Sequence, residues 1–427
     1  HALGTRALVV APFVWVATEL GRTHLFTGFP WVLLGYSQVT AIPVAQFASV
    51  AGVYGLSALV AGVSAALAAA APRLVHDRRP GMARGRGAPP ARVVSGWSTR
   101  YAPVGLMALL VLGIGLWGSL RVRNGGLTRT GVAVRVGLVQ GNIDQAVKYD
   151  PAHVLSIFGD YMRMTRQAIG EGAEFVLWPE SSTPFYFEDD RGAADQVRLL
   201  AAQARVPILV GSDQVERPPV VVGRFDPAQR APSRYYNSAF LVGANGRVAG
   251  VYRKMHLVPF GEYVPLKQVF FFAGHLVEAV SDFSAGDAAV LLPVQEHLVS
   301  TAICYEIVYP NLVRESVRGG SELLTTITND AWFGETSAPY QHFQQASMRA
   351  IENGRYLVRS ANTGISGVVD PYGRVLSASR LYEPAVLVGD ARFLRTTTIY
   401  TRTGDVFAYA SAILAAAALV AARRRVR

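Results

Sequence analysis

Four long apolar runs constrain the fold of this chain more than any other feature. They cover residues 3–20, 42–71, 103–120 and 406–422. At a rise of about 1.5 Å per residue, each run is long enough as a helix to cross, or nearly cross, a hydrocarbon core of about 30 Å. We therefore expect a helical membrane domain over residues 1–120, a soluble domain over 121–405, and a last membrane helix with a basic tail over 406–427.

The basic residues indicate how these spans are oriented. The chain has a formal net charge of +11, and its arginines cluster in the loop 73–100 and in the tail 423–427, each beside an apolar run. Loops on the cytoplasmic side of a membrane carry an excess of Lys and Arg. The soluble domain is therefore expected outside, in the periplasm of a bacterium with an outer membrane. No groove-reading motif accompanies the charge, so we expect no nucleic-acid partner.

The soluble domain alternates short strand patterns with helix patterns. Strands are expected at residues 134–140, 175–178, 207–210, 239–242, 248–252, 298–303, 323–328 and 357–360. Helices are expected at residues 151–169, 193–204, 311–318 and 340–353. Asn245-Gly246 predicts a type I′ hairpin, and Tyr372-Gly373 predicts a second hairpin. The alternation predicts a layered α/β domain.

Three reactive side chains each follow a strand-like run. They are Glu180, Lys254 and Cys304, the only cysteine of the chain. Rigid strand ends commonly present active-site groups to a cleft. A carboxylate can take the proton of a thiol, and an ammonium can stabilise the oxyanion that forms when the thiol attacks a carbonyl. The set therefore predicts acyl transfer, with Glu180 as general base and Cys304 as nucleophile.

Each of these residues also has an ordinary structural explanation when it is taken alone. A lone cysteine is usually a small buried hydrophobe, a glutamate before a serine commonly caps a helix, and Lys254 could be the exposed end of a hairpin. The ordered set of three, each inside a longer pattern, outweighs these alternatives.

The longer patterns resemble a known family. Trp-Pro-Glu-Ser at 178–181, the run 254–265 and Cys-Tyr-Glu at 304–306 are similar to the Glu-Lys-Cys triad regions of the nitrilase superfamily. Thr-Gly-Phe-Pro-Trp at 27–31 and Asn-Asp-Ala-Trp-Phe-Gly at 329–334 resemble apolipoprotein N-acyltransferases more specifically. The resemblance covers essentially the whole chain. It implies a nitrilase-like four-layer αββα sandwich inserted in a multi-pass helical membrane domain, with about three N-terminal spans absent before His1.

The resemblance also implies roles for particular residues. Glu180, Lys254 and Cys304 form the triad, and Glu262 and Glu306 hold the lysine and shape the pocket. Asn237, Tyr305 and Trp332 support loops or substrate. Tyr149 stands where relatives are expected to carry tryptophan, and the aromatic ring kept there implies a role in acyl-chain packing.

The implied reaction has two steps and needs no cofactor. An acyl chain passes from a phospholipid, typically phosphatidylethanolamine, to Cys304, and then to the α-amine of a diacylglyceryl-cysteine apolipoprotein. Both substrates reside in the bilayer of the bacterial inner membrane. The histidines show no metal-ligand spacing, so no metal site is expected.

Two other functions remain open from the sequence. A membrane-tethered amidase or nitrilase would use the same triad with water as the second nucleophile. A non-catalytic scaffold or transporter would carry charges along its spans, and apart from Glu19 these have essentially none. Phe270–Phe272, in a segment with few strand or helix cues, either form a lipid-dipping lid over Cys304 or pack on the domain itself.

Overall fold

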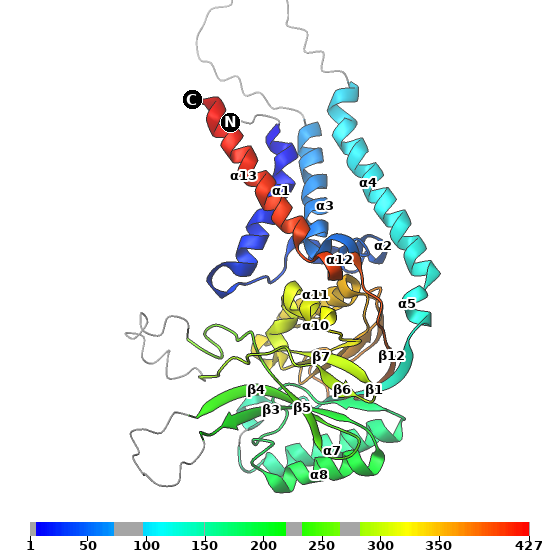
Figure 1. Ribbon diagram of the computed structural model, residues 1–427, viewed down its shortest axis with the longest axis vertical. Helices are drawn as coiled ribbons and strands as arrows, with labels where there is room; N and C mark the ends of the chain where they lie inside the picture. Colours follow the sequence, from blue (N-terminus) through cyan, green and yellow to red (C-terminus); the bar gives the residue numbers. More distant parts are fainter. Residues whose placement is uncertain (1–5, 72–96, 149, 219–232, 265–281, 427) are drawn as a thin grey trace, which may run out of the picture.

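Membrane helices and a layered sheet domain occupy opposite ends of the protein. The computed structural model describes residues 6–71, 97–148, 150–218, 233–264 and 282–426. Four long helices form one end, and two β-sheets with their covering helices form the other (Figure 1). The short helices α2 (Ile42–Ala45) and α12 (Ile399–Thr403) lie between the two ends, and η2 (Leu34–Gln38) packs against α3 (Ala48–Ala70) (Figure 1).

The four long helices correspond to the four predicted spans. They are α1 (Arg6–His24), α3 (Ala48–Ala70), α4 (Trp97–Asn124) and α13 (Val406–Val426). Within the described residues, three stretches are long and apolar enough to cross a membrane, namely Ala48–Ala70, Tyr101–Arg129 and Val406–Arg424. Helix α1 is not one of these three, although it packs against α3 and α13. The predicted domain boundaries therefore stay a prediction.

The second predicted span is divided. Pro43 lies in the short helix α2, and α3 begins only at Ala48. Gly52 interrupts α3 with a φ of +66°, a backbone angle that residues other than glycine rarely adopt. A Cβ at this position would lie 2.5 Å from the ring of Tyr400, so the close approach of α12 to α3 also requires glycine.

The soluble domain consists of two six-stranded sheets. The first has the order β12-β1-β2-β3-β4-β5 and the second the order β11-β10-β9-β8-β7-β6. The strands of the first sheet are β1 (Val132–Gln140), β2 (Phe175–Leu177), β3 (Ile208–Glu216), β4 (Arg234–Val242), β5 (Val248–Arg253) and β12 (Ala385–Phe393). Those of the second are β6 (Leu292–Val294), β7 (His297–Ile303), β8 (Leu323–Thr328), β9 (Leu357–Ala361), β10 (Gly367–Val369) and β11 (Val375–Ala378).

Parallel strands form the centre of each sheet. Strands β1, β2 and β3 run parallel in the first sheet, and β7, β8 and β9 run parallel in the second. Antiparallel strands complete both edges. Parallel strands present their carboxyl ends on the same side of a sheet, which is where loops with functional residues commonly gather.

Helices cover the outer face of each sheet, which gives four layers. Helices α7 (Val154–Gly170) and α8 (Arg191–Ala204) cover the first sheet, and α10 (Pro310–Arg318) and α11 (Ala338–Asn353) cover the second (Figure 1). Successive side chains of one strand point to opposite faces of its sheet. Leu177 of β2 packs between the sheets, whereas Val176 packs under the helices. The predicted four-layer αββα sandwich is confirmed.

The strands and helices predicted for the soluble domain are present with small shifts in their ends. Strand bounds were not predicted for β6, β10, β11 and β12, although β10 and β11 flank the predicted hairpin at Tyr372-Gly373. Strand β12 pairs with β1 along its whole length, and its side chains are mostly half-buried, so its sequence lacks a clear apolar pattern.

The predicted hairpin at Asn245-Gly246 is present between β4 and β5, but the predicted turn type is wrong. A type I′ turn needs a positive φ at both central residues; Gly246 has a φ of +74°, whereas Asn245 has a negative φ. The backbone N–H of Gly246 donates to Gly243 O in the turn.

Candidate active site

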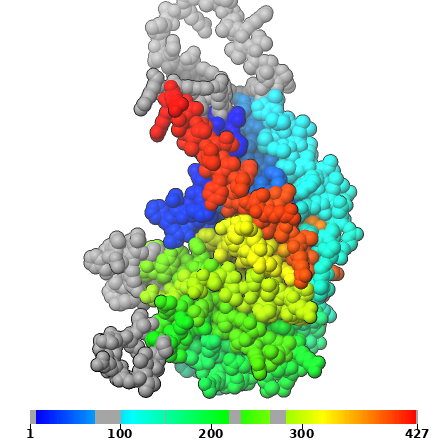
Figure 2. Space-filling view, viewed as in Figure 1, coloured from blue at the N-terminus to red at the C-terminus, as the bar shows by residue number. Residues whose placement is uncertain are grey.

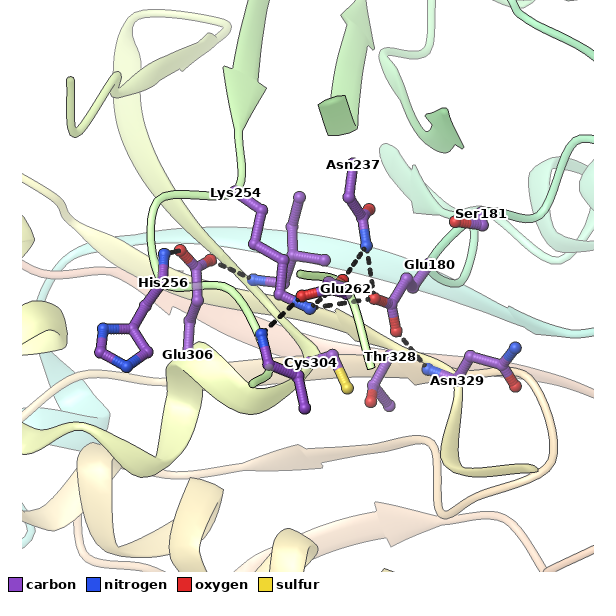
Figure 3. A network of polar contacts seen from close by, with 12 residues as sticks. Glu180, Ser181, Asn237, Lys254, His256, Glu262, Cys304, Glu306, Thr328 and Asn329 are labelled. Carbon is purple, nitrogen blue, oxygen red and sulfur yellow. Dashed lines mark hydrogen bonds and ion pairs between the residues drawn. The ribbon is translucent and has the colours of Figure 1, made fainter. Parts of the chain in front are cut away.

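The three predicted catalytic residues lie together between the two sheets. Glu180 follows β2, Lys254 follows β5, and Cys304 follows β7 at the start of η5 (Cys304–Val308) (Figure 3). All three are buried, with exposed fractions of 7%, 1% and 8%. The first sheet therefore supplies the carboxylate and the ammonium, and the second sheet supplies the thiol.

A glycine lets the Glu180 segment lie close to its neighbouring strand. A Cβ at Gly211 of β3 would lie 2.0 Å from the carbonyl oxygen of Pro179. In the same place the backbone N–H of Ser182 donates to Gly211 O at 2.8 Å. A larger residue at Gly211 would push the segment with Glu180 out of position.

Lys254 forms ion pairs with two carboxylates. Its Nζ lies 2.8 Å from Glu262 Oε1 and 3.4 Å from Glu180 Oε1. Burial lowers the pKa of Lys254, but the carboxylates of Glu262 and Glu180 outweigh burial, and the pKa stands above its ordinary value. The side chain is therefore an ammonium at neutral pH, as an oxyanion-stabilising role requires.

Asn237 and the backbone of Asn329 fix the orientation of the base. Asn237 Nδ2 donates to Glu180 Oε1 at 2.7 Å and to Glu262 Oε1 at 3.1 Å. The other oxygen of Glu180 accepts from the N–H of Asn329 at 2.8 Å. The structure thus brings the predicted Asn237 and Glu262 into contact with the triad.

Glu306 has a different place from the one expected. Its Oε1 accepts from the backbone N–H groups of Met255 and His256 at 2.7 and 3.0 Å, and its Oε2 accepts from Ile303 N at 2.8 Å. Burial raises the pKa of Glu306, and the backbone donors of Ile303 and His256 oppose that rise. Glu306 therefore joins the segment after Lys254 to the segment before Cys304, whereas Glu262 is the carboxylate that holds the ammonium directly.

The Cys304 thiol sits in a strained turn. Its φ of +53° is uncommon for a residue with a side chain. Burial raises the pKa of the Cys304 thiol, the Glu180 carboxylate raises it further, and Lys254 opposes both. The thiol is therefore neutral at physiological pH and needs a base to take its proton, which is the role that the sequence predicts for Glu180.

A buried polar cluster that sequence reasoning missed lies behind the nucleophile. His342 Nε2 lies 3.1 Å from the carbonyl oxygen of Cys304, and Nδ1 lies 2.9 Å from Asp330 Oδ1. Arg359 Nη2 donates to Asp330 Oδ2 at 2.8 Å. Because a carbonyl oxygen only accepts, Nε2 must be the donor in this contact.

The charges of this cluster are balanced within it. Burial raises the pKa of Asp330, but Arg359 and His342 outweigh burial and bring the pKa down to about 2. His342 and Arg359 are wholly buried. Arg359 is a large polar residue within the otherwise mostly apolar β9, whereas His342 lies among several polar residues of α11. One sequence alone does not distinguish either residue from a residue on an exposed face.

A cluster of aromatic side chains connects the site with the segment that follows α1. Tyr305 lies between Phe29 and Tyr309, with ring centroids 6.2 and 5.2 Å from its own. Tyr309 donates from its hydroxyl to Gly28 O at 2.9 Å, and Trp31 packs on Phe333 at 5.4 Å. The predicted segment 27–31 of the membrane domain therefore lies directly over the residues next to the nucleophile.

One other predicted site residue, Trp332, does not join this group. Trp332 is 76% exposed, whereas its neighbour Phe333 packs against Trp31. Tyr149 and the segment Phe270–Phe272 lie outside the described residues. Among the residues that the structure describes, no group of three or more His, Cys, Asp or Glu side chains could hold a metal ion.

Two family models match this chain. Residues 135–398 match the carbon-nitrogen hydrolase family, and residues 2–66 match the N-terminal domain of apolipoprotein N-acyltransferases. A mutant of the Nesterenkonia AN1 amidase from the nitrilase superfamily aligns with 62% of this chain and 92% of its own, at 22% identity and a TM-score of 0.45.

Curated relatives align along nearly the whole chain. The apolipoprotein N-acyltransferase of Geobacter metallireducens is 39% identical over 426 residues, which is 98% of this chain and 74% of the relative. That of Bradyrhizobium diazoefficiens is 34% identical over 434 residues, covering 99% of this chain and 74% of the relative. The chain therefore belongs to the apolipoprotein N-acyltransferase family, with a carbon-nitrogen hydrolase domain between its membrane helices.

Proposed function

We propose that this protein transfers a fatty acyl chain from a phospholipid to the N-terminal amine of a diacylglyceryl-cysteine apolipoprotein, through a thioester on Cys304. The observation that carries the proposal is the contact between the segment after α1 and the residue that follows the nucleophile. The segment 27–31, which follows α1, packs on Tyr305, the residue after Cys304. A site for soluble amides has no need of such a contact, whereas lipid substrates must reach the thiol from the membrane.

In the first half-reaction, Glu180 takes the proton of the Cys304 thiol as the sulfur attacks the ester carbonyl of the donor lipid. The tetrahedral oxyanion lies near the Lys254 ammonium, which stabilises it. The C–O bond to the glycerol then breaks, and Glu180 returns its proton to the departing oxygen. A lysophospholipid leaves, and the acyl chain stays on the sulfur as a thioester.

In the second half-reaction, the α-amine of the apolipoprotein attacks the thioester carbonyl and Glu180 takes a proton from the nitrogen. The C–S bond breaks, an amide forms, and the proton returns to the sulfur of Cys304. Asn237 and the N–H of Asn329 hold Glu180 through both halves. Because the same carboxylate serves twice, its orientation matters in each half.

The orientation in the membrane follows from the arginines. The tail 423–427 and the loop 73–100 are basic, which favours the cytoplasm for both. We place the sheets on the outer side of the bacterial inner membrane, where phosphatidylethanolamine is a suitable donor. Helix α1 is the fourth proposed span, and its buried Glu19 accepts from Leu34 N at 2.6 Å instead of facing lipid.

The acceptor separates acyl transfer from the alternative, hydrolysis by water. Given phosphatidylethanolamine and a diacylglyceryl-cysteine peptide, the protein should convert the peptide to its N-acylated form, measured by mass spectrometry. The same peptide with an acetylated amine should receive no acyl chain. Release of free fatty acid at the same rate with either peptide would instead make the protein a hydrolase.

The role of Glu180 predicts a change in pH dependence. The pKa of the Cys304 thiol is raised, so the thiolate fraction is small at neutral pH and grows about tenfold for each pH unit up to that pKa. In Glu180→Gln, acylation of Cys304 by the donor lipid should be slow and rise with that slope between pH 7 and 9. The unaltered protein should show a much flatter profile. An unchanged rate and profile in the variant would contradict the role of Glu180.

The contact between His342 and the Cys304 carbonyl predicts a positioning role. His342→Phe keeps a ring beside Trp31 but removes the donor, so single-turnover acylation should fall roughly ten- to a hundredfold, as expected for about 1–3 kcal/mol. The KM for the donor should change little, and His342→Gln, which keeps an N–H donor, should recover part of the rate.

A control histidine lies at the start of β7, the strand that leads to Cys304. His297 begins β7, stacks on Phe393 and pairs with Glu322 at 2.7 Å. His297→Phe also removes an imidazole–carboxylate pair, and it should leave the acylation rate near that of the unaltered protein. Equal losses of rate in His342→Phe and His297→Phe would mean that His342 acts only through stability.

A further inference from the structure

A cavity opens where the membrane helices meet the sheet domain, outside the site around Cys304. It has a volume of about 630 Å³, within the range of about 300–1,000 Å³ that is usual for small-molecule sites. The end of α4, the helix α5 (Gly126–Arg129) and the segment leading into α12 enclose it, and these elements lie side by side in the space-filling view (Figure 2). Its polar lining comes from Arg121, Asn124, Tyr372 and the hydroxyls of Thr130 and Thr396–Thr398.

Among the described residues, Arg121 contacts two aromatic rings and forms no ion pair. Its guanidinium lies 5.7 Å from the ring centroid of Trp117 and 5.9 Å from that of Tyr372. Its Nε is buried and has no hydrogen-bond partner among the described residues. A buried guanidinium N–H without an acceptor costs free energy, so the position favours an acceptor supplied from outside the chain.

Among the described residues that line the cavity, Arg121 is the only charged one. None of the described residues that line the cavity carries a carboxylate. Two further guanidinium groups contact the same threonines: Arg402 Nε donates to Thr397 Oγ1 at 2.9 Å, and Arg355 Nη1 donates to Thr396 O. An anion therefore fits this cavity, and a phosphate group suits guanidinium and hydroxyl donors in particular.

The apolar surface next to the cavity indicates that the anion belongs to a lipid. Leu109, Leu112 and Leu116 recur at helical spacing on α4, and each is at least 65% exposed. Their row ends at Trp117 and Leu120, which line the cavity. Trp and Arg at the end of a membrane helix typically lie at the depth of the lipid headgroups. Acyl chains along the leucines would place a headgroup phosphate beside Arg121.

We propose that this cavity is a binding site for the phosphodiester headgroup of a phospholipid with a net negative charge, separate from the acyl-donor site at Cys304. Arg121 and the hydroxyls of Thr396 and Thr397 bind the phosphate oxygens, and the row of leucines on α4 receives an acyl chain. The lipid fills the space between α4 and the sheet domain. It thereby supports the position of α4 relative to the sheets without entering the reaction.

Native mass spectrometry of the full chain released from detergent tests the proposal, with phosphatidylglycerol as the probe lipid. The unaltered protein should retain one more phosphatidylglycerol than Arg121→Gln, whose affinity at this site should be about tenfold lower, since a charge-assisted hydrogen bond is lost. Arg123→Gln is the control, because it removes the same charge from the same helix at a residue that does not line the cavity. Lipid in the donor site is common to all three proteins and cancels in the comparison.

Three further results decide the outcome. Arg121→Lys, which keeps the charge, should keep most of the retained lipid, so a loss caused by misfolding of Arg121→Gln can be distinguished. Inorganic phosphate at millimolar concentration should not displace phosphatidylglycerol from the unaltered protein. If phosphate displaces the lipid that depends on Arg121, the cavity is a site for free anions and the proposal is overturned. Equal lipid retention by the unaltered protein and Arg121→Gln would overturn it as well. None of these measurements depends on acyl transfer.

Discussion

The buried contact of Lys254 with two carboxylates is the interaction on which the rest of the site depends. An isolated ammonium that is 1% exposed would lose its proton or destabilise the fold, and Glu262 and Glu180 prevent both. These ion pairs also fix the position of the catalytic base. With its charge shared between Lys254 and Asn237, Glu180 stays oriented toward the space where the Cys304 thiol lies, and a thiol whose pKa burial has raised has a base at hand.

The membrane helices and the catalytic sheets are joined by buried polar contacts as well as by packing. Glu352 of α11 accepts from the backbone of Val53 at the break in α3, and Arg349 donates to Tyr36 at 2.7 Å. The same helix, α11, carries His342, which binds the carbonyl of Cys304. A single rigid helix thus connects the nucleophile with the membrane domain, so the position of the thiol relative to the bilayer is set by the fold itself.

The sequence predicted the features that depend on local pattern and missed those that depend on pairing between distant segments. Glu180, Lys254 and Cys304 each follow a strand, and the structure brings them together as expected. The different place of Glu306, bonded to backbone rather than to Lys254, follows from the turn after β5, which no local pattern encodes. His342 and Arg359 were missed because only the fold shows that they are buried, and β12 because its half-buried residues lack a strand signature.

The thioester on Cys304 is the central claim, and intact-protein mass spectrometry tests it most directly. After the purified protein is mixed with phosphatidylethanolamine, its mass should rise by one fatty acyl group. Hydroxylamine should remove the added mass, and Cys304→Ala should never acquire it. A folded protein that gains no acyl group, or a Cys304→Ala variant that gains the same one, would contradict the account.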